Sequence, residues 1–362
     1  MYTYGPKYAA GALTPEDAQK IMGIVTRYEM PLILEYALAF ALFKTYAIPS
    51  ISKLLAATKE LKSDESISKR YADTSILIST WVQCPISGYV EATSEKPLQD
   101  PRASLAIARV NYLHSRYNIK NDDYLYTLAL FMFEPSRWAS KYGWRPLSPL
   151  ESYAMYLFWV EIGNRMGIKD IPDTEEGFKA WVEEYESKHM RPAQTNHDVA
   201  TYTTNELIYP IPEAFGLKNL ARKMSIAVLD ENVRVAMMFC AWNVKYFHLP
   251  RPSCWVYSQI SVPLPQFKEG EEPLMTPGYF QPRPWYKPLP TTWAGWTWNW
   301  VLVKLGKYAE MPSEKFEAGG YRLDGMGPLK YEHAGREEVY RMAEKMLGCP
   351  VNKAWKVPPK GK

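Results

Sequence analysis

The chain has 362 residues, of which 47% are apolar, and this length allows one large domain with a substantial core. Its 43 basic and 39 acidic residues leave a net charge of +4 and form no Lys/Arg tract, so no nucleic acid partner is implied. The HExxH, GxSxG, P-loop and dinucleotide-binding motifs are absent, so the sequence gives no support for the enzyme classes that these motifs mark.

Aromatic residues make up 14% of the chain, including 13 Trp and 26 Tyr. This content suits a large aromatic core, an apolar ligand cavity or a surface that contacts a membrane, and composition alone leaves these alternatives open. The four cysteines lie far apart without a CxxC pair, which is typical of free thiols in a reducing compartment rather than of a disulfide framework.

Helical signals dominate the first two thirds of the chain. Thr14 is followed by a proline and, three residues on, by Asp17, which is the pattern of a capping box at a helix start. Ser148 and Glu151 repeat this pattern further along. We therefore expect helices that begin at these two points.

Residues 30–48 form the most hydrophobic run, but Glu35 and Lys44 interrupt it. Its longest charge-free part, 36–43, is far shorter than the roughly 20 apolar residues that span a bilayer. We predict a buried helix here rather than a membrane-inserted one. The N-terminus carries no secretory signal, so we expect an intracellular protein, with peripheral contact to the endoplasmic reticulum membrane as a further possibility.

Residues 68–82 predict an amphipathic helix with polar residues on its apolar face. Arg70 and Thr74 share that face with Leu77 and Trp81 by helical spacing, and Asp73 lies next to Thr74. Because an unpaired buried charge is costly, Arg70 needs a partner. An internal acid and an anionic group of a cofactor or substrate are both open alternatives.

Residues 102–138 predict two helices joined by a short polar turn, around which the rest of the chain is organised. In the first helix one buried face carries Ile107, Val110, His114 and Tyr117. A different stripe, which we expect water to solvate, carries Arg102, Arg109 and Arg116. His114 therefore faces the core and is the first candidate for chemistry, although an inward histidine is often only a hydrogen-bonded core residue.

Asn121 is expected to cap the second helix of this pair, which should be central because it is apolar almost all round. The dipeptide Glu134-Pro135 is expected to end it, with Arg137 as a local partner of the glutamate. The remaining histidines have no familiar metal spacing and are expected to be structural or exposed; they are His189, His197, His248 and His333.

The composition changes after residue 249. Ten prolines fall between Pro250 and Pro290, which predicts an extended, wrapping segment. The alternating tryptophans Trp296, Trp298 and Trp300 are compatible with a short strand or an aromatic surface patch. Beyond them, residues 336–347 predict a final helix.

Several long runs resemble a known family, the fungal endoplasmic-reticulum-bound oxygenases of the type that cleaves the prenyl chain in mycophenolic acid biosynthesis. A more distant likeness is to bacterial rubber oxygenases, the latex-clearing proteins. The resemblance covers most of residues 14–240, and its clearest runs are YEMPLILEYALAFALFKTYAIPSISKLL, KRYADT, YLHSRYNIKNDDYLYTLALFMFEPSRWASKYGWRPL and EIGNRMGIKDIPDTEEGFKAWVEEYESKHM.

The resemblance implies haem b as the cofactor, with His114 at the position of the proximal iron ligand. Arg70 and Thr74 match the first and last members of an Arg-x-x-Lys-Thr motif on the distal side, but Asp73 stands where the family has lysine. An aspartate there would move protons or hold a water rather than contact oxygen as a cation. Arg70 would neutralise a haem propionate or orient a distal ligand.

Together these features predict an all-α protein, with one large helical domain (1–249) around a buried cofactor or ligand cavity and a Pro/Trp-rich segment (250–362) packed on it. The expected activity is a haem-dependent oxygenase that uses O₂ to cleave a carbon–carbon double bond of an apolar isoprenoid or prenylated substrate. Candidate catalytic residues are Arg70, Asp73 and Thr74, with His114 on the iron. Two alternatives stay open: a cofactor-free acid/base enzyme, such as a cyclase or dehydratase, and a non-catalytic carrier of haem or a hydrophobic ligand.

Overall fold

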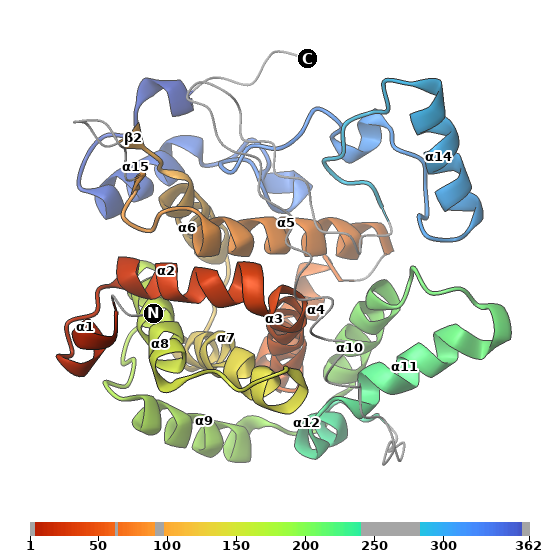
Figure 1. Cartoon of the computed structure of the whole chain (residues 1–362). Coiled ribbons are helices and arrows are strands. Elements are labelled where there is room, and N and C mark those ends of the chain that lie inside the picture. The colour runs from red at the N-terminus through yellow and green to blue at the C-terminus, as the bar shows by residue number, and fades with distance from the viewer. Residues whose placement is uncertain (1–3, 62–63, 91–97, 240–282, 357–362) are drawn as a thin grey trace.

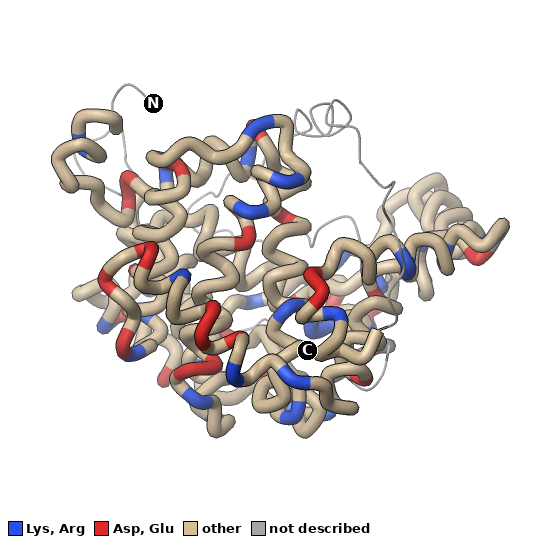
Figure 2. The backbone as a smooth tube through the Cα atoms, turned by 90° about the horizontal axis from the view of Figure 1, so that it is seen from below, with Lys and Arg blue, Asp and Glu red and all other residues tan. Residues whose placement is uncertain are grey.

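The computed structural model describes residues 4–61, 64–90, 98–239 and 283–356. The described chain is all-α, as predicted, and its strands are two residue pairs, β1 (Tyr89–Val90) and β2 (Leu98–Gln99), that form one antiparallel ladder. Figure 1 shows the helices stacked around α3 (Pro31–Thr45), which runs through the middle of the molecule. Figure 2 shows basic and acidic positions interspersed along the backbone.

The helices of the N-terminal two thirds build most of the core. α3 packs against α7 (Asn121–Tyr142), and α7 packs against α8 (Pro149–Arg165), which in turn contacts α2 (Pro15–Ile24). α7 is buried along most of its length, which confirms that it is a central helix. The other helices of this part are α1 (Gly5–Ala9), α4 (Pro49–Thr58), α5 (Asp64–Gln83), α6 (Arg102–His114), α9 (Glu175–His189), α10 (Gln194–Leu207), α11 (Leu217–Ala227) and α12 (Glu231–Ala236).

Both predicted capping boxes are present. The Thr14 hydroxyl accepts a hydrogen bond from the backbone N–H of Asp17 while the Asp17 carboxylate accepts from the Thr14 N–H, and Ser148 and Glu151 do the same at the start of α8. Each box satisfies two N–H groups that a helix start leaves without partners. These starts are local in sequence, which is why they could be predicted.

The prediction that α7 ends at Pro135 is wrong, since the helix continues to Tyr142 with Pro135 inside it. A proline within a helix costs about 3 kcal/mol. The turns beyond it bury Trp138, whose ring lies 4.9 Å from that of Phe40 on α3. Packing of the Trp138 side chain offsets the lost backbone hydrogen bond. The predicted pair of Glu134 and Arg137 is confirmed, with an N–O distance of 2.6 Å.

The expectation that water solvates the stripe of arginines on α6 is wrong for Arg109, which is fully buried. Its guanidinium donates to three backbone carbonyls of the C-terminal segment, those of Met326 (2.6 Å), Tyr331 (2.7 Å) and Ala334 (2.8 Å). α15 (Arg336–Leu347) packs on α6 and covers this face. Three carbonyl acceptors take the place of water around the buried charge.

The tryptophan-rich stretch forms a helix, α14 (Trp293–Lys304), so the strand alternative is wrong and the aromatic surface patch is confirmed. The extended segment predicted between 250 and 290 lies outside the described residues up to 282, as does His248. Over the described ranges, no single helix has the length and apolar composition to cross a membrane, while Ile33–Thr45 and Pro49–Thr58 form a candidate pair that is bent by 94°.

Candidate active site around His114

His114 is the last residue of α6 and is half-buried, with its ring 5.6 Å from that of Tyr124 at the start of α7. Its Nδ1 atom is buried, and neither ring nitrogen has a hydrogen-bond partner among the described residues. An unpaired buried polar atom costs about 1–3 kcal/mol. A group bound beside the ring would supply the missing partner.

The environment of His114 keeps its imidazole neutral. Burial lowers its pKa from 6.5 to about 4, and the positive charge of Arg70 adds to this effect. The C-terminal end of a helix favours a protonated histidine, so desolvation and Arg70 together outweigh the helix dipole. A neutral imidazole is the form that binds a metal ion.

Arg70, on α5, lies within electrostatic reach of His114 and Tyr46. It is half-buried, and within the described ranges its guanidinium makes no hydrogen bond or ion pair. Among the described residues, Arg70 therefore has no internal acid as its partner. Thr74, one turn further along α5, is also half-buried and has no side-chain hydrogen bond to a described residue.

Several other polar side chains face the same region. Glu35 on α3 has a solvent-accessible carboxylate, yet surrounding protein raises its pKa. Burial also raises the pKa values of Tyr71, which is next to Arg70, and of Tyr46 and Tyr36. Accessible side chains with a strong desolvation effect are typical of a recess rather than of the open surface.

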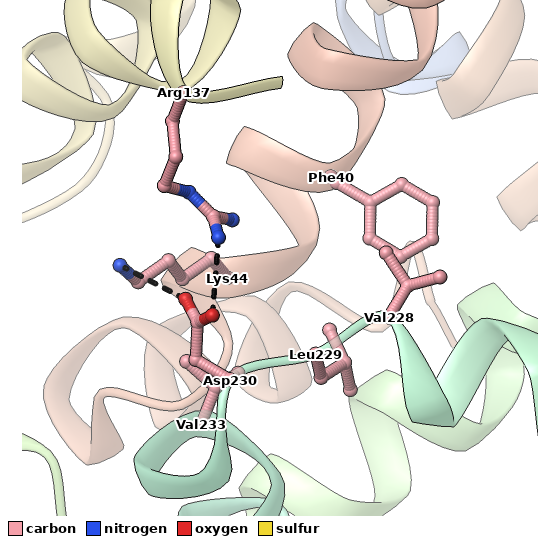
Figure 3. A pocket seen from close by; sticks show the side chains of 7 residues that line it. All are labelled: Phe40, Lys44, Arg137, Val228, Leu229, Asp230 and Val233. Carbon is pink, nitrogen blue, oxygen red and sulfur yellow. Dashed lines mark hydrogen bonds and ion pairs between the residues drawn. The ribbon is translucent and has the colours of Figure 1, made fainter. Parts of the chain in front are cut away.

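An apolar pocket lies between α3, α5, α10 and α11. Its lining residues are Ala39, Phe40, Phe43, Tyr71, Thr203, Thr204, Leu207 and Ser225. Tyr71 follows Arg70 in α5, but neither Arg70 nor His114 lines this pocket. Phe40 also lines a second small pocket, together with Lys44, Arg137, Val228, Leu229, Asp230 and Val233 (Figure 3).

The carboxylate of Asp73 does not share one site with the side chains of Arg70 and Thr74. It is buried on the face of α5 that the C-terminal segment covers, where it forms an ion pair with Lys69 at 3.1 Å and accepts a hydrogen bond from the Tyr286 hydroxyl. Lys69 also donates to Tyr286 (2.8 Å) and to the Gly327 carbonyl (3.1 Å). Desolvation raises the pKa of Asp73, while Lys69 and Tyr286 oppose this rise.

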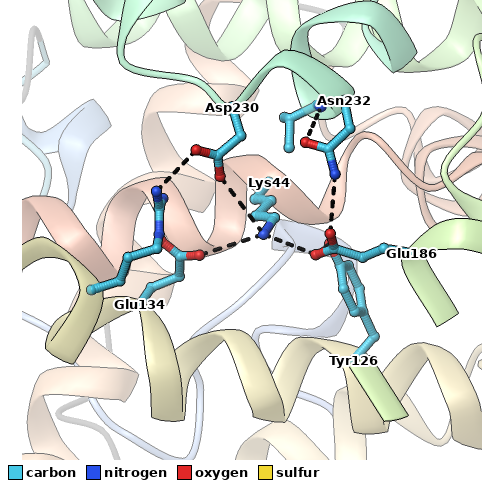
Figure 4. Close-up of polar contacts among 8 residues, drawn as sticks. Lys44, Tyr126, Glu134, Glu186, Asp230 and Asn232 are labelled. Carbon is cyan, nitrogen blue, oxygen red and sulfur yellow. Dashed lines mark hydrogen bonds and ion pairs between the residues drawn. The ribbon is translucent and has the colours of Figure 1, made fainter. Parts of the chain in front are cut away.

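A second polar cluster, in which only Glu134 is fully buried, was not predicted. Lys44 on α3 meets Glu186 at 2.8 Å, Glu134 at 3.5 Å and Asp230 at 4.0 Å (Figure 4). The sequence signal for this cluster was a lysine, Lys44, in an otherwise apolar run. Its partners come from three other helical regions, so no local sequence pattern identifies them. The cluster joins α3, α7, α9 and the start of α12.

The other described histidines have structural or surface positions, as predicted. His197 Nδ1 lies 3.0 Å from the Met237 carbonyl, the His189 ring lies 4.6 Å from that of Tyr185, and His333 is exposed. No group of three or more potential metal-ligating side chains occurs in the described part of the chain. Among the described histidines, His114 is distinguished by a ring nitrogen that is both buried and without a hydrogen-bond partner.

Residues 39–246 match the family model described as ER-bound oxygenase mpaB/B'/rubber oxygenase, catalytic domain. The chain belongs to this oxygenase family. Similar proteins include ER-bound oxygenase mpaB' of Penicillium brevicompactum, 29% identical over 371 aligned positions that cover 92% of this chain and 82% of the relative. ER-bound oxygenase mpaB of Penicillium roqueforti is 35% identical over 63% of this chain and 77% of the relative. The mpaB protein of Penicillium brevicompactum is 31% identical over 78% and 71%.

Membership of the mpaB/rubber oxygenase family makes this protein an oxidoreductase that uses O₂ on a small-molecule substrate. The matched catalytic domain contains Arg70, Asp73, Thr74 and His114, whereas Tyr286, α14 and α15 lie beyond it. The contacts of Asp73 and Arg109 therefore tie a segment outside the matched domain to two helices inside it.

Proposed function

We propose that this oxygenase is haem-dependent, in which case His114 would ligate the iron of a b-type haem and Arg70 would pair with a haem propionate. The observation that carries the proposal is the neutral imidazole of His114, which has a buried ring nitrogen without a partner and lies near an unpaired guanidinium. An axial ligand must be deprotonated, and a carboxylate is a natural partner for a guanidinium. The residues present fit this cofactor.

When bound, the haem would supply the activation of O₂, which no side chain can provide. The protein's own part is to hold the imidazole neutral, to pair the cofactor's negative charge and to keep water away. Arg70 lowers the pKa of His114, so the same residue serves the first two tasks. Tyr71 and the apolar walls of the pocket that it lines serve the third.

We propose an apolar isoprenoid or prenylated substrate, with cleavage of a carbon–carbon double bond to carbonyl products. The pocket beside Tyr71 supports this substrate class, because Phe40, Phe43 and Leu207 offer it an apolar wall. The family model's description includes rubber oxygenase, and rubber is a polyisoprenoid. A distal proton relay by Asp73 has less support, since its carboxylate is already engaged by Lys69 and Tyr286.

We also propose peripheral attachment to the endoplasmic reticulum membrane. The relatives carry ER-bound in their names, and apolar substrates of the proposed class concentrate in membranes. This location is independent of the proposed cofactor.

The visible absorption spectrum of the purified protein tests the cofactor. We expect a Soret band that His114→Ala removes, while the matched variant His197→Ala, in which a partnered histidine is lost, keeps it. Absence of the band from the wild type would favour the cofactor-free acid/base enzyme. A Soret band without O₂-dependent formation of carbonyl products from a prenylated compound would favour a haem carrier.

A further inference from the structure

Two helices on one side of the molecule carry apolar side chains that the protein leaves uncovered. α14 and α11 contain no buried residue, and both project from the body at the right of Figure 1. On α14, Trp293 is 84% exposed and Trp298 is 62% exposed. Phe215, two residues before α11, is fully exposed. Large exposed apolar groups gathered in this way indicate an interaction surface.

The distribution of tryptophans around α14 favours a fluid partner over a rigid one. With about 100° between successive residues, Trp293, Trp296 and Trp300 share one side of the helix and Trp298 lies nearly opposite. A protein groove would cover one side and leave the other in water. Fluid headgroups and acyl chains can fill the space around rings that point in several directions, and indole rings prefer a lipid interface because they combine an apolar body with a polar N–H.

The length of α14 determines how it could sit in a bilayer. Its 12 residues extend about 18 Å, well short of the roughly 30 Å of a hydrocarbon core. The helix therefore suits a position within the headgroup region rather than a path across the membrane. α11 is amphipathic, with exposed Leu217 and Leu220 on one side, which suits the same position.

The charges around both helices match an anionic lipid surface. No acidic residue occurs from 214 to 229 or from 283 to 309. Among the basic residues of these segments, Lys218 pairs with Glu213 at 3.1 Å and Arg283 with Glu310 at 3.4 Å, and both acids lie just outside the segments. The other basic residues there are Arg222, Lys223, Lys287, Lys304 and Lys307. The chain as a whole is nearly balanced, with 43 basic and 39 acidic residues. Basic residues beside exposed tryptophans and leucines are typical of peripheral membrane-binding helices.

We propose that α14, α11 and Phe215 form one docking face that seats this protein on an anionic lipid bilayer. The inference deepens the membrane location proposed above and does not depend on the haem. It assigns the contact to these two helices and not to α3, whose apolar side chains pack against α7. Ser225 of α11 lines the apolar pocket that reaches Tyr71, so docking would bring this pocket near the lipid.

Flotation of the full-length protein with phosphatidylcholine vesicles, with and without phosphatidylserine, tests this face. We expect the wild type to float with vesicles that contain phosphatidylserine. The triple variant Trp293→Ser, Trp298→Ser, Trp300→Ser should lower the partition coefficient at least about tenfold, because burial of each indole at the interface contributes to binding. Because α14 has no buried residue, the variant should keep the wild-type circular dichroism spectrum and melting temperature.

Trp144→Ser is the matched control, since Trp144 is 41% exposed and lies outside both helices, in the loop between α7 and α8. Equal flotation of the triple variant and the wild type, or an equal loss in Trp144→Ser, would overturn the proposal. Loss of a dimer from the triple variant on gel filtration, without vesicle binding by the wild type, would assign the face to self-association instead. The Soret band is recorded on the same samples, so failure of the docking face and failure of the proposed cofactor are separate results.

Discussion

The positive charge of Arg70 on α5 acts on the imidazole of His114 at the end of α6. Neither side chain has a hydrogen-bond partner in the part of the chain that the structure describes. The positive charge of Arg70 lowers the pKa of His114, while burial of the imidazole contributes most of the shift. The buried Nδ1 atom of His114 carries the cost of an unsatisfied polar group, whereas Arg70 is half-buried and none of its atoms is fully buried without a partner. The proposed haem would give both side chains a partner, through its iron and one propionate.

Replacement of Arg70 should weaken cofactor retention. Arg70→Ala removes a charge-assisted contact of about 1.5–3 kcal/mol, so haem affinity should fall roughly 10- to 100-fold. The pKa of His114 in the haem-free protein should move up toward 6.5, because the nearby positive charge is gone. Haem titration measures the first effect and NMR of the imidazole measures the second, with Thr74→Ala as the control. Unchanged values in both measurements would remove Arg70 from the site.

The haem-free protein should lose stability in acid because of His114. Its folded pKa of about 4 lies below the unfolded value of 6.5, so the unfolded state binds a proton first as the pH falls. Stability from this group is complete above pH 6.5 and is lost progressively between that value and about 4, by roughly 3 kcal/mol in total. Urea unfolding at several pH values in wild type and His114→Phe measures the difference. Parallel pH profiles of the two proteins would contradict it.

Removal of Lys69 should destabilise the fold more than removal of its whole ion pair. Lys69→Met leaves the buried Asp73 carboxylate without its cation, which costs about 3–5 kcal/mol, whereas Lys69→Met with Asp73→Leu removes both charges and should recover much of that loss. Chemical denaturation of the two variants decides this. Turnover per bound haem in Asp73→Asn is the companion measurement. A large fall in turnover with normal stability would restore the catalytic role that the sequence suggested for Asp73.

The contact between α15 and α6 can be tested through two glycines with the same backbone conformation. Gly335 and Gly348 have φ angles of 75° and 69°, so alanine is strained at both. A Cβ at Gly335 would lie 2.1 Å from the Tyr112 ring, while a Cβ at Gly348 would meet open space. Gly348→Ala should therefore cost about 1 kcal/mol and Gly335→Ala clearly more. Equal melting temperatures for the two variants would show that α15 does not pack this closely on α6.

Features that depend on neighbouring residues could be predicted from the sequence, and features made by distant segments could not. The capping boxes of Thr14 and Ser148 and the buried position of α7 follow from local pattern. The burial of Arg109 does not, because its three acceptors lie more than 200 positions away. For the same reason the sequence predicted Asp73 at one site with Arg70 and Thr74, whereas in the structure its carboxylate accepts a hydrogen bond from the distant Tyr286.

The fold of α14 shows a limit of a different kind. Alternating tryptophans are compatible with a strand, but Thr292 caps a helix here by accepting a hydrogen bond from the Gly295 N–H. Three tryptophans spaced two residues apart form too short a pattern to distinguish a helix from a strand. From composition, the exposure of these tryptophan side chains could be predicted only as one of several alternatives.

Rescue of His114→Gly with free imidazole tests most directly whether His114 ligates the iron of a haem. We expect this variant to lack the wild-type Soret band when purified and to regain it, together with O₂-dependent activity, when haem and imidazole are added. The matched variant His197→Gly should need no imidazole. A His114→Gly protein that binds haem with the wild-type spectrum in the absence of imidazole would contradict the proposed role of His114 as the iron ligand.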